Sequence, residues 1–269
     1  MKSDRRCGNA GRLGVVITGG TSGIGLALAR VFLAAGDRVV ICGRDSVRLE
    51  RAMQELRQQV PEGEIHGMSC DVSRAGDIGN FAAFTKACLG RVDRWINNAG
   101  SAGALKRPLW ELDCHDIQEV SGTNLGGTMM ACSLAVRLML EQPASTQPAY
   151  HIFNMGFSPG GARFSHSSAP HRASKLAVGN VTAFLRDELR RNHIGWIGVH
   201  ELSPGLVKTP LLFRDAPPSS LRFLEAVAEE PETAAASLVP KIRSVKSRGC
   251  RIRLASFPVS SVRLKIKKV

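Results

Sequence analysis

The sequence is poor in tyrosine and has no long hydrophobic run. Tyr150 is the only tyrosine among 269 residues, and aromatic side chains make up 5% of the chain. No apolar stretch approaches the roughly 18 residues that a transmembrane helix needs, and none near the start resembles a signal peptide. We therefore expect neither a membrane-spanning nor a secreted protein. With 43% hydrophobic residues, the chain can still bury one substantial core.

Paired cysteines are also missing. The seven cysteines are scattered and odd in number, and no two of them stand in a Cys-x-x-Cys pair with metal or redox spacing. A reducing compartment is the simpler interpretation, and we expect no metal site. Cys42 and Cys70 fall in predicted strands, where we interpret them as small core residues rather than ligands.

Acidic side chains are absent from residues 241–269. This segment holds ten lysine and arginine residues, so the preceding 240 residues carry 26 basic against 23 acidic side chains, although the whole chain has a net charge of +13. Because the basic charge belongs to a tail, we expect no nucleic-acid partner, and binding of nucleic acid or an anionic surface through this tail is the alternative. The alternating stretch Val262-Arg-Leu-Lys-Ile-Lys267 suits an edge strand with a cationic face, an arm that supports peripheral membrane association, or a solvated terminus.

Short β-branched runs alternate with helical patterns along the chain, which implies right-handed βαβ crossovers. We therefore predict an α/β fold of Rossmann type, a doubly wound parallel sheet of about seven strands with helices on both faces. Residues 1–12 would form an N-terminal extension, 13–255 a single domain, and 256–269 a basic C-terminal tail. Strands are predicted at 13–17, 38–42, 65–72, 92–96, 150–154, 194–200 and 251–255, and helices near 26–33, 49–60, 77–89 and 116–142 and from about residue 171.

A glycine-rich turn, Thr18-Gly-Gly-Thr-Ser-Gly-Ile-Gly25, separates the first predicted strand from a helix. Residues without a side chain let the backbone turn tightly and bring helix N-terminal N–H groups against a pyrophosphate. The turn therefore predicts a dinucleotide site, and an ordinary glycine-rich turn is the alternative. The predicted contacts are Gly19, Thr21, Ser22, Gly23, Ile24 and Gly25.

The second predicted strand ends at Cys42-Gly-Arg44 without an acidic residue. A carboxylate there would bind the adenosine ribose and repel a 2′-phosphate, whereas Arg44 can pair with that phosphate. The sequence therefore favours NADPH over NADH, and a solvated surface arginine is the alternative. Asp71 and Val72 follow the third strand, where they are expected to bind the adenine amino group and pack against its ring.

Several motifs occur in the order in which the short-chain dehydrogenase/reductase family carries them, and the chain resembles that family from Leu13 to about Ala255. The motifs are Thr18–Gly25, Asn97-Asn-Ala-Gly100, Asn124, Ser158, Lys175 and Ser203-Pro-Gly205. The resemblance implies hydride transfer with a nicotinamide cofactor and a homo- or hetero-oligomer. It adds further cofactor contacts at Asn98, Ala99, Gly100, Lys175, Pro204, Gly205, Val207 and Thr209.

The resemblance also implies a catalytic set in which one member is replaced. In the family a tyrosine four residues before the lysine protonates the substrate carbonyl oxygen, and the lysine lowers the pKa of that tyrosine. By position Asn124, Ser158 and Lys175 match, and His171 stands where tyrosine is expected. Tyr150 lies at the start of the fifth predicted strand and is not expected to replace the missing phenol.

Histidine is a poor substitute for that tyrosine. Neutral imidazole is a weak acid, and the charge of Lys175 is expected to lower the pKa of His171. Its reach is also roughly 2 Å shorter than that of tyrosine. Loss of a positioned acid costs about 10²- to 10⁴-fold in rate. Two interpretations follow: a reductase of impaired activity, or an NADP(H)-binding partner subunit without turnover.

Within the family the chain looks most like the plant and algal chlorophyll b reductases. This resemblance implies NADPH-dependent reduction of the 7-formyl group of chlorophyll(ide) b to hydroxymethyl, an apolar chlorophyll-like substrate, and a thylakoid-associated location in the chloroplast. About a dozen residues precede the first strand, too few for a transit peptide, so a cytoplasmic location is the alternative. The matching stretches are Trp95–Gly100, Thr123-Asn-Leu-Gly-Gly127, His151-Ile-Phe-Asn-Met155, Ser203–Val207, Pro231-Glu-Thr233 and Leu238-Val-Pro240.

Substrate specificity is expected to reside in two segments, about 101–113 and 206–230. The second segment suits either an apolar lid or an ordinary packed helix. Its large apolar residues are Leu206, Leu211, Leu212, Phe213, Leu221 and Phe223.

Overall fold

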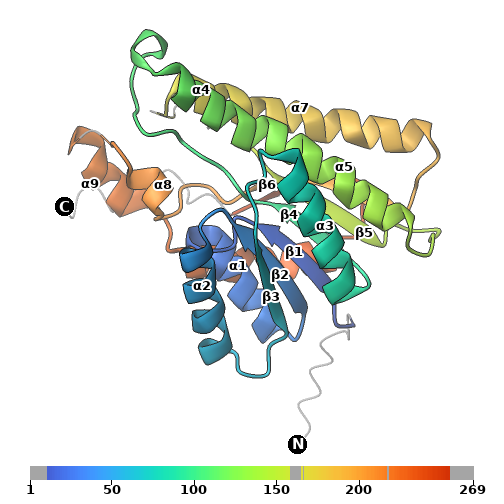
Figure 1. The fold of residues 1–269 in the computed structure, drawn as a ribbon. Helices are drawn as coiled ribbons and strands as arrows, with labels where there is room; N and C mark the ends of the chain where they lie inside the picture. The colour runs from blue at the N-terminus through green and yellow to red at the C-terminus, as the bar shows by residue number, and fades with distance from the viewer. Residues whose placement is uncertain (1–10, 158–164, 166, 217, 255–269) are drawn as a thin grey trace, which may run out of the picture.

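The computed structural model describes residues 11–157, 165, 167–216 and 218–254. Its parallel strands form one sheet in the order β3-β2-β1-β4-β5-β6-β7 (Figure 1). The chain adds β2 and β3 on one side of β1 and then adds β4 to β7 on its other side, so the strand order reverses between β1 and β4. The predicted doubly wound sheet of about seven strands is therefore confirmed. The strands are β1 (Gly14–Thr18), β2 (Arg38–Gly43), β3 (Ile65–Ser69), β4 (Arg94–Asn97), β5 (Tyr150–Met155), β6 (Ile197–Ser203) and β7 (Arg251–Arg253).

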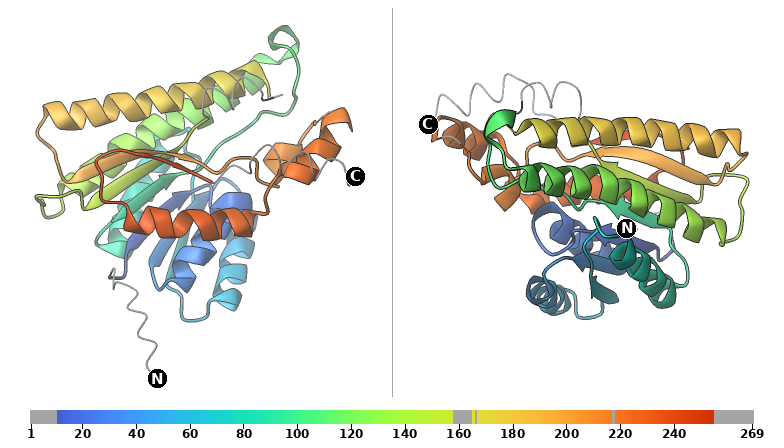
Figure 2. Two further views of the ribbon diagram at one scale, coloured as in Figure 1. Left: turned by 180° about the vertical axis from the view of Figure 1, so that it is seen from behind. Right: turned by 45° about the horizontal axis from the view of Figure 1, so that its top comes forward.

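Helices cover both faces of this sheet (Figures 1 and 2). One face packs against α1 (Gly23–Ala34), α2 (Ser46–Gln59) and α10 (Pro231–Ser244), the red-orange helix in the left view of Figure 2. The other face packs against α3 (Ala75–Leu89), α5 (Gly127–Leu140) and α7 (Ala169–Arg191). None of the helices in the described ranges is long and apolar enough to cross a membrane.

The strands supply both halves of the core because successive side chains of a strand point to opposite faces of the sheet. In β1, Val15 and Ile17 join the cluster under α1 and α2, while Val16 joins the cluster under α3 and α5. All three side chains are completely buried. This burial on both faces explains why the strand reads as a continuous apolar run rather than an alternating one.

The single helix predicted over 116–142 is interrupted. It consists of α4 (Cys114–Ser121), a π-helical segment η2 (Gly122–Gly126) and α5. The helix begins before the predicted residue because the Asp113 carboxylate accepts a hydrogen bond from the backbone N–H of His115 at 2.6 Å. A π-helical turn changes the direction in which the following side chains point and is frequent at functional sites. Here it carries Asn124.

The bounds of the predicted strands differ from those in the structure by one to three residues, and the largest differences are in β3 and β6. β3 ends at Ser69 rather than at residue 72, since the N–H of Arg74 donates to the Asp71 carbonyl and makes a turn. β6 starts at Ile197, because Ile194 donates to the Leu189 carbonyl and so completes the end of α7. The predicted domain limits stay a prediction, and residues 256–269 lie outside the described part of the chain.

Candidate active site

The predicted site residues gather at the carboxyl ends of the central strands, where the sheet reverses direction between β1 and β4. The turn after β1 needs its glycines. Gly19 has a φ of +65° and Gly23 one of +54°, values that favour glycine. A β-carbon on Gly19 would lie 2.8 Å from the Ala99 Cα, and one on Gly25 would lie 2.3 Å from the Gly19 oxygen. The close approach of two backbone segments therefore excludes any larger residue.

The turn leads directly into the N-terminus of α1. Ser22 is the N-cap residue, and its side chain makes no capping hydrogen bond within the described structure. The first N–H groups of α1 are thus available to an anion such as a pyrophosphate. Thr21 lies against Gly43 at the end of β2, where an added β-carbon would be 2.5 Å from its Cγ2. Ile24 packs partly into the core.

The segment after β4 fixes this turn in place. The Asn98 side chain donates from Nδ2 to the carbonyl oxygens of Thr18 at 2.9 Å and Gly19 at 2.8 Å. In return Thr18 Oγ1 accepts from the backbone N–H groups of Asn98 and Ala99 at 3.1 and 3.0 Å. These hydrogen bonds therefore hold the glycine turn in place. The predicted direct contact of Asn98 and Ala99 with a cofactor stays a prediction.

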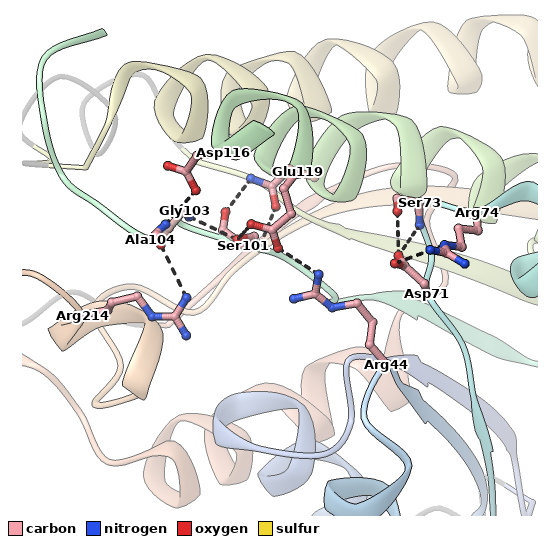
Figure 3. A network of polar contacts seen from close by, with 11 residues as sticks. Arg44, Asp71, Ser73, Arg74, Ser101, Gly103, Ala104, Asp116, Glu119 and Arg214 are labelled. Carbon is pink, nitrogen blue, oxygen red and sulfur yellow. Dashed lines mark hydrogen bonds and ion pairs between the residues drawn. The ribbon is translucent and has the colours of Figure 1, made fainter. Parts of the chain in front are cut away.

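Arg44 and Asp71 lie at neighbouring strand ends, after β2 and β3 (Figure 3). Asp71 accepts from the N–H and hydroxyl of Ser73 at 3.0 and 2.6 Å. Partial burial opposes its ionisation, but the Ser73 bonds and the charges of Arg44 and Arg74 outweigh it and hold the pKa of Asp71 below its usual value. Arg44 forms an ion pair with Glu119 of α4, which sequence reasoning missed. Val72 is buried beside Asp71.

A second group forms where η2 and α7 meet the end of β4. A β-carbon on Gly100 would lie 3.1 Å from both Asn124 Oδ1 and Lys175 Nζ, so the absence of a side chain there lets these two polar atoms approach the backbone closely. Asn124 is fully buried and donates from Nδ2 to the Ser101 carbonyl at 2.9 Å and to Ser174 Oγ at 3.0 Å. Lys175 Nζ donates to the Met155 carbonyl at 3.2 Å. Burial lowers the pKa of Lys175 to about 8.

His171 is buried one turn before Lys175 on α7, with 2% of its surface exposed. Its ring meets Phe157 edge-on, with 5.2 Å between ring centroids. Neither ring nitrogen has a hydrogen-bond partner among the described residues. Burial, then the charges of Lys175 and Lys106, lower the pKa of His171 to about 4, the direction that the sequence predicts. The imidazole is therefore neutral at pH 7.

Two further positions bear on the proton donor. Ser158, predicted to orient the substrate, lies outside the described residues. Tyr150 opens β5, at the end of the sheet opposite the site, and its hydroxyl donates to the Pro143 carbonyl at 2.9 Å. Its side chain is buried there, so the only phenol of the chain belongs to the core. This agrees with the expectation that Tyr150 does not replace the missing tyrosine.

The segment after β6 returns to the glycine turn. Gly205 has a φ of +74°, and Val207 pairs with Glu229 in an isolated parallel bridge. Pro204 precedes this bend. Thr209 caps α8 (Pro210–Phe213) and touches the turn, because a β-carbon on Gly23 would lie 2.8 Å from its Cγ2. The predicted residues after β6 are thus brought beside those after β1.

The two specificity segments contact each other at this end of the sheet. Lys106 Nζ donates to the Leu212 carbonyl at 2.9 Å, and the Lys106 N–H donates to the Asp215 carboxylate at 2.6 Å. Sequence reasoning missed Lys106. Helix α9 (Pro218–Val227), which is part of the second segment, projects beyond the sheet (Figure 1). Large apolar side chains are exposed on both segments: Leu105, Leu109, Trp110, Leu206, Leu211 and Phe223.

A family model described as short chain dehydrogenase matches residues 14–217. The chloroplastic chlorophyll(ide) b reductase NOL of Arabidopsis thaliana is 39% identical over 236 residues, which cover 87% of this chain and 66% of that protein. The probable chlorophyll(ide) b reductase NYC1 of Oryza sativa subsp. japonica is 35% identical over 264 residues, with 93% of this chain and 51% of that protein covered. The chain thus spans less than two thirds of the length of these relatives.

Solved structures show the same architecture. A variant of actinorhodin polyketide ketoreductase with NADPH is 29% identical, with a TM-score of 0.73 and coverage of 90% of this chain and 95% of that one. A short-chain dehydrogenase/reductase from Burkholderia phymatum in complex with NAD is 26% identical, with a TM-score of 0.74 and coverage of 96% and 94%. The seven-stranded arrangement is therefore shared with nucleotide-dependent reductases.

Proposed function

The chain belongs to the short-chain dehydrogenase/reductase family of oxidoreductases, and we propose that it uses NADPH to reduce the 7-formyl group of chlorophyll(ide) b to hydroxymethyl. One observation carries the proposal. The glycine turn, Asn124 and the buried Lys175 meet at the carboxyl ends of β1 and β4, where Asn124 and Lys175 lie close to the backbone of Gly100. This is the place in a doubly wound sheet where a dinucleotide binds.

The residues present fit such a cofactor. The N-terminus of α1 is suited to the pyrophosphate, and Arg44 is suited to an adenosine 2′-phosphate, which favours NADPH over NADH. When bound, the cofactor supplies hydride to the substrate carbonyl carbon. Solved relatives carry NADP, NADPH or NAD, so the preference for NADPH depends on Arg44.

The substrate class follows from the relatives and from the segments beside the site. The chlorophyll(ide) b reductases that the chain matches are chloroplastic, and we place this protein in the same compartment. The apolar residues Leu105, Trp110 and Phe223 are exposed on the two specificity segments. They suit a large apolar substrate such as a chlorophyll.

We propose that the proton comes from a source other than His171. A group with a pKa of about 4 is almost entirely deprotonated at pH 7, whereas Lys175, with a pKa of about 8, still carries its proton there. Neutral imidazole retains one N–H group, which can donate a hydrogen bond to the carbonyl oxygen. We therefore assign the proton to the Lys175 ammonium, directly or through water, and expect slow turnover.

A second candidate function is a non-catalytic NADP(H)-binding partner subunit. It is favoured by His171 alone, because the residue is neutral and both ring nitrogens lack a partner among the described residues. Such a protein would retain the cofactor-binding residues around Gly19 and Arg44 while lacking the acid that completes reduction.

Turnover and binding measured together separate the two candidates. The protein is mixed with NADPH and chlorophyll b in detergent, and hydroxymethyl product and bound NADPH are measured over a range of pH. Product at any pH supports the reductase. NADPH binding without product supports the partner subunit, and failure to bind NADPH contradicts both.

A further inference from the structure

Arg44 does not stand free at the end of β2. Its Nη1 atom lies 2.9 Å from Oε1 of Glu119, so the guanidinium reaches from the β2 end to α4 (Figure 3). We propose that Glu119 determines cofactor specificity by competing with the adenosine 2′-phosphate for Arg44. This inference rests on the proposed NADPH-dependent function and adds to it a residue that opposes NADPH binding.

Glu119 is the fixed member of the pair. Its second oxygen, Oε2, accepts a hydrogen bond from Ser101 Oγ at 3.2 Å. Ser101 is in turn held by Asn124, which accepts from the Ser101 N–H at 2.8 Å and donates to its carbonyl at 2.9 Å. The Glu119 side chain is 27% exposed and that of Arg44 53%, so the arginine has the greater freedom to move. The carboxylate therefore stays in position when Arg44 turns toward another anion.

The surrounding charges give Glu119 this role rather than Asp71. Arg44 is close enough to Asp71 to lower its pKa, but Asp71 already accepts two hydrogen bonds from Ser73 and faces Arg74. Glu119 is the carboxylate in direct contact with the Arg44 guanidinium. A 2′-phosphate at Arg44 would share the guanidinium with this carboxylate and would experience the negative charge of Glu119.

The consequence differs between the two cofactors. NADH has no 2′-phosphate, so it can bind while the ion pair stays intact. NADPH brings a second anion to the Arg44 guanidinium, so its contact with Arg44 competes with that ion pair. Glu119 thus reduces the preference for NADPH below the value that Arg44 alone would give.

The test uses Glu119→Gln, which removes the charge and retains an oxygen that can accept the Ser101 hydrogen bond. Dissociation constants are measured by calorimetry for NADPH and NADH, and for the fragments 2′,5′-ADP and 5′-AMP. Affinity for NADPH and 2′,5′-ADP is expected to rise about three- to fivefold, the size of one exposed ion pair, with NADH and 5′-AMP unchanged. The gain is expected to shrink in 0.5 M salt because exposed charges are screened.

Two controls define the outcome. Glu141→Gln removes a carboxylate that pairs with Lys86, at the C-terminal end of α5, and is expected to change none of the four constants. Arg44→Ala is expected to remove the preference for NADPH and to abolish the effect of Glu119→Gln in the double variant. Weaker NADPH binding by Glu119→Gln, or equal changes for NADPH and NADH, would overturn the inference alone. A parent protein that binds no NADPH would contradict the proposed function as well.

Discussion

His171 and Lys175 are buried one helical turn apart on the same face of α7. In the reactions of this family that spacing places a proton donor beside a cation, but here the donor is an imidazole. Burial and the charge of Lys175 both oppose protonation of His171, and its pKa falls to about 4. The same burial brings the pKa of Lys175 to about 8, close to the pH at which a general acid is most effective. These pKa values are the reason for proposing Lys175, rather than His171, as the source of the proton.

Replacing His171 by tyrosine is expected to restore a positioned acid. A positioned general acid contributes about 10²- to 10⁴-fold, so turnover of chlorophyll b by His171→Tyr should rise within that range. His171→Phe is the matched control, because it fills the same space without a hydroxyl group. Product formation is measured under single turnover, with the NADPH dissociation constant measured in parallel. A His171→Phe variant as fast as His171→Tyr would show that volume, not the hydroxyl, limits the parent.

The pH dependence of the parent identifies its acid. If Lys175 supplies the proton, kcat falls as the pH rises through about 8, because the neutral amine has no proton to give. If His171 supplied it, the decline would occur near pH 4 instead. A profile without any decline over this range would assign the proton to water. Titration of Lys175 by NMR with labelled lysine provides an independent measure, and should give the same midpoint as kcat.

Much of this site could be predicted from the sequence because its residues meet local backbone requirements. Gly19 and Gly25 are dictated by a tight turn and a close approach; Gly19 directly follows β1, and Gly25 lies in the first turn of α1. The ion pair between Arg44 and Glu119 could not be predicted, since the residues are 75 positions apart. Their meeting depends on where α4 begins and how it is turned.

The orientation of α4 depends on two features that the apolar pattern does not reveal. One is the cap at Asp113, which starts the helix, and the other is the π-helical segment Gly122–Gly126. The sequence prediction is wrong for the end of β3 and the start of β6 for a related reason. Each end is determined by the turn beside it, at Asp71 and at Ile194, rather than by the local run of apolar residues.

The close approach at Gly19 predicts loss of cofactor binding on substitution. In Gly19→Ala the new methyl group would lie 2.8 Å from the Ala99 Cα, at a φ of +65°, so the turn has to shift. We expect NADPH binding to be lost and the free energy of unfolding to fall by about 1 to 3 kcal/mol. Gly36→Ala is the control, since Gly36 has a φ of +84° but no atom within 4 Å of the added carbon. Gly36→Ala should lose stability yet bind NADPH as the parent does. Equal loss of NADPH binding in both variants would contradict the role of the glycine turn in cofactor binding.

The buried imidazoles of His151 and His200 predict a loss of stability in mild acid. His151 Nδ1 lies 2.9 Å from His200 Nε2, and His200 Nδ1 accepts from the Cys250 N–H at 3.1 Å, so His200 carries its proton on Nε2. Burial first, then nearby positive charge, lower the pKa of each histidine to about 3. Between about pH 6.5 and 3 the unfolded chain therefore binds protons that the folded chain does not, and stability falls as the pH falls.

Each of these histidines should contribute about 1.4 kcal/mol per pH unit to the slope of unfolding free energy against pH in this window. The slope is measured by urea unfolding at pH 6, 5 and 4. His200→Gln is expected to lower it by about one such contribution whatever its own cost in stability, because one titrating group is removed. An unaltered slope in His200→Gln would mean that His200 binds its proton as readily in the folded as in the unfolded chain, in conflict with its complete burial.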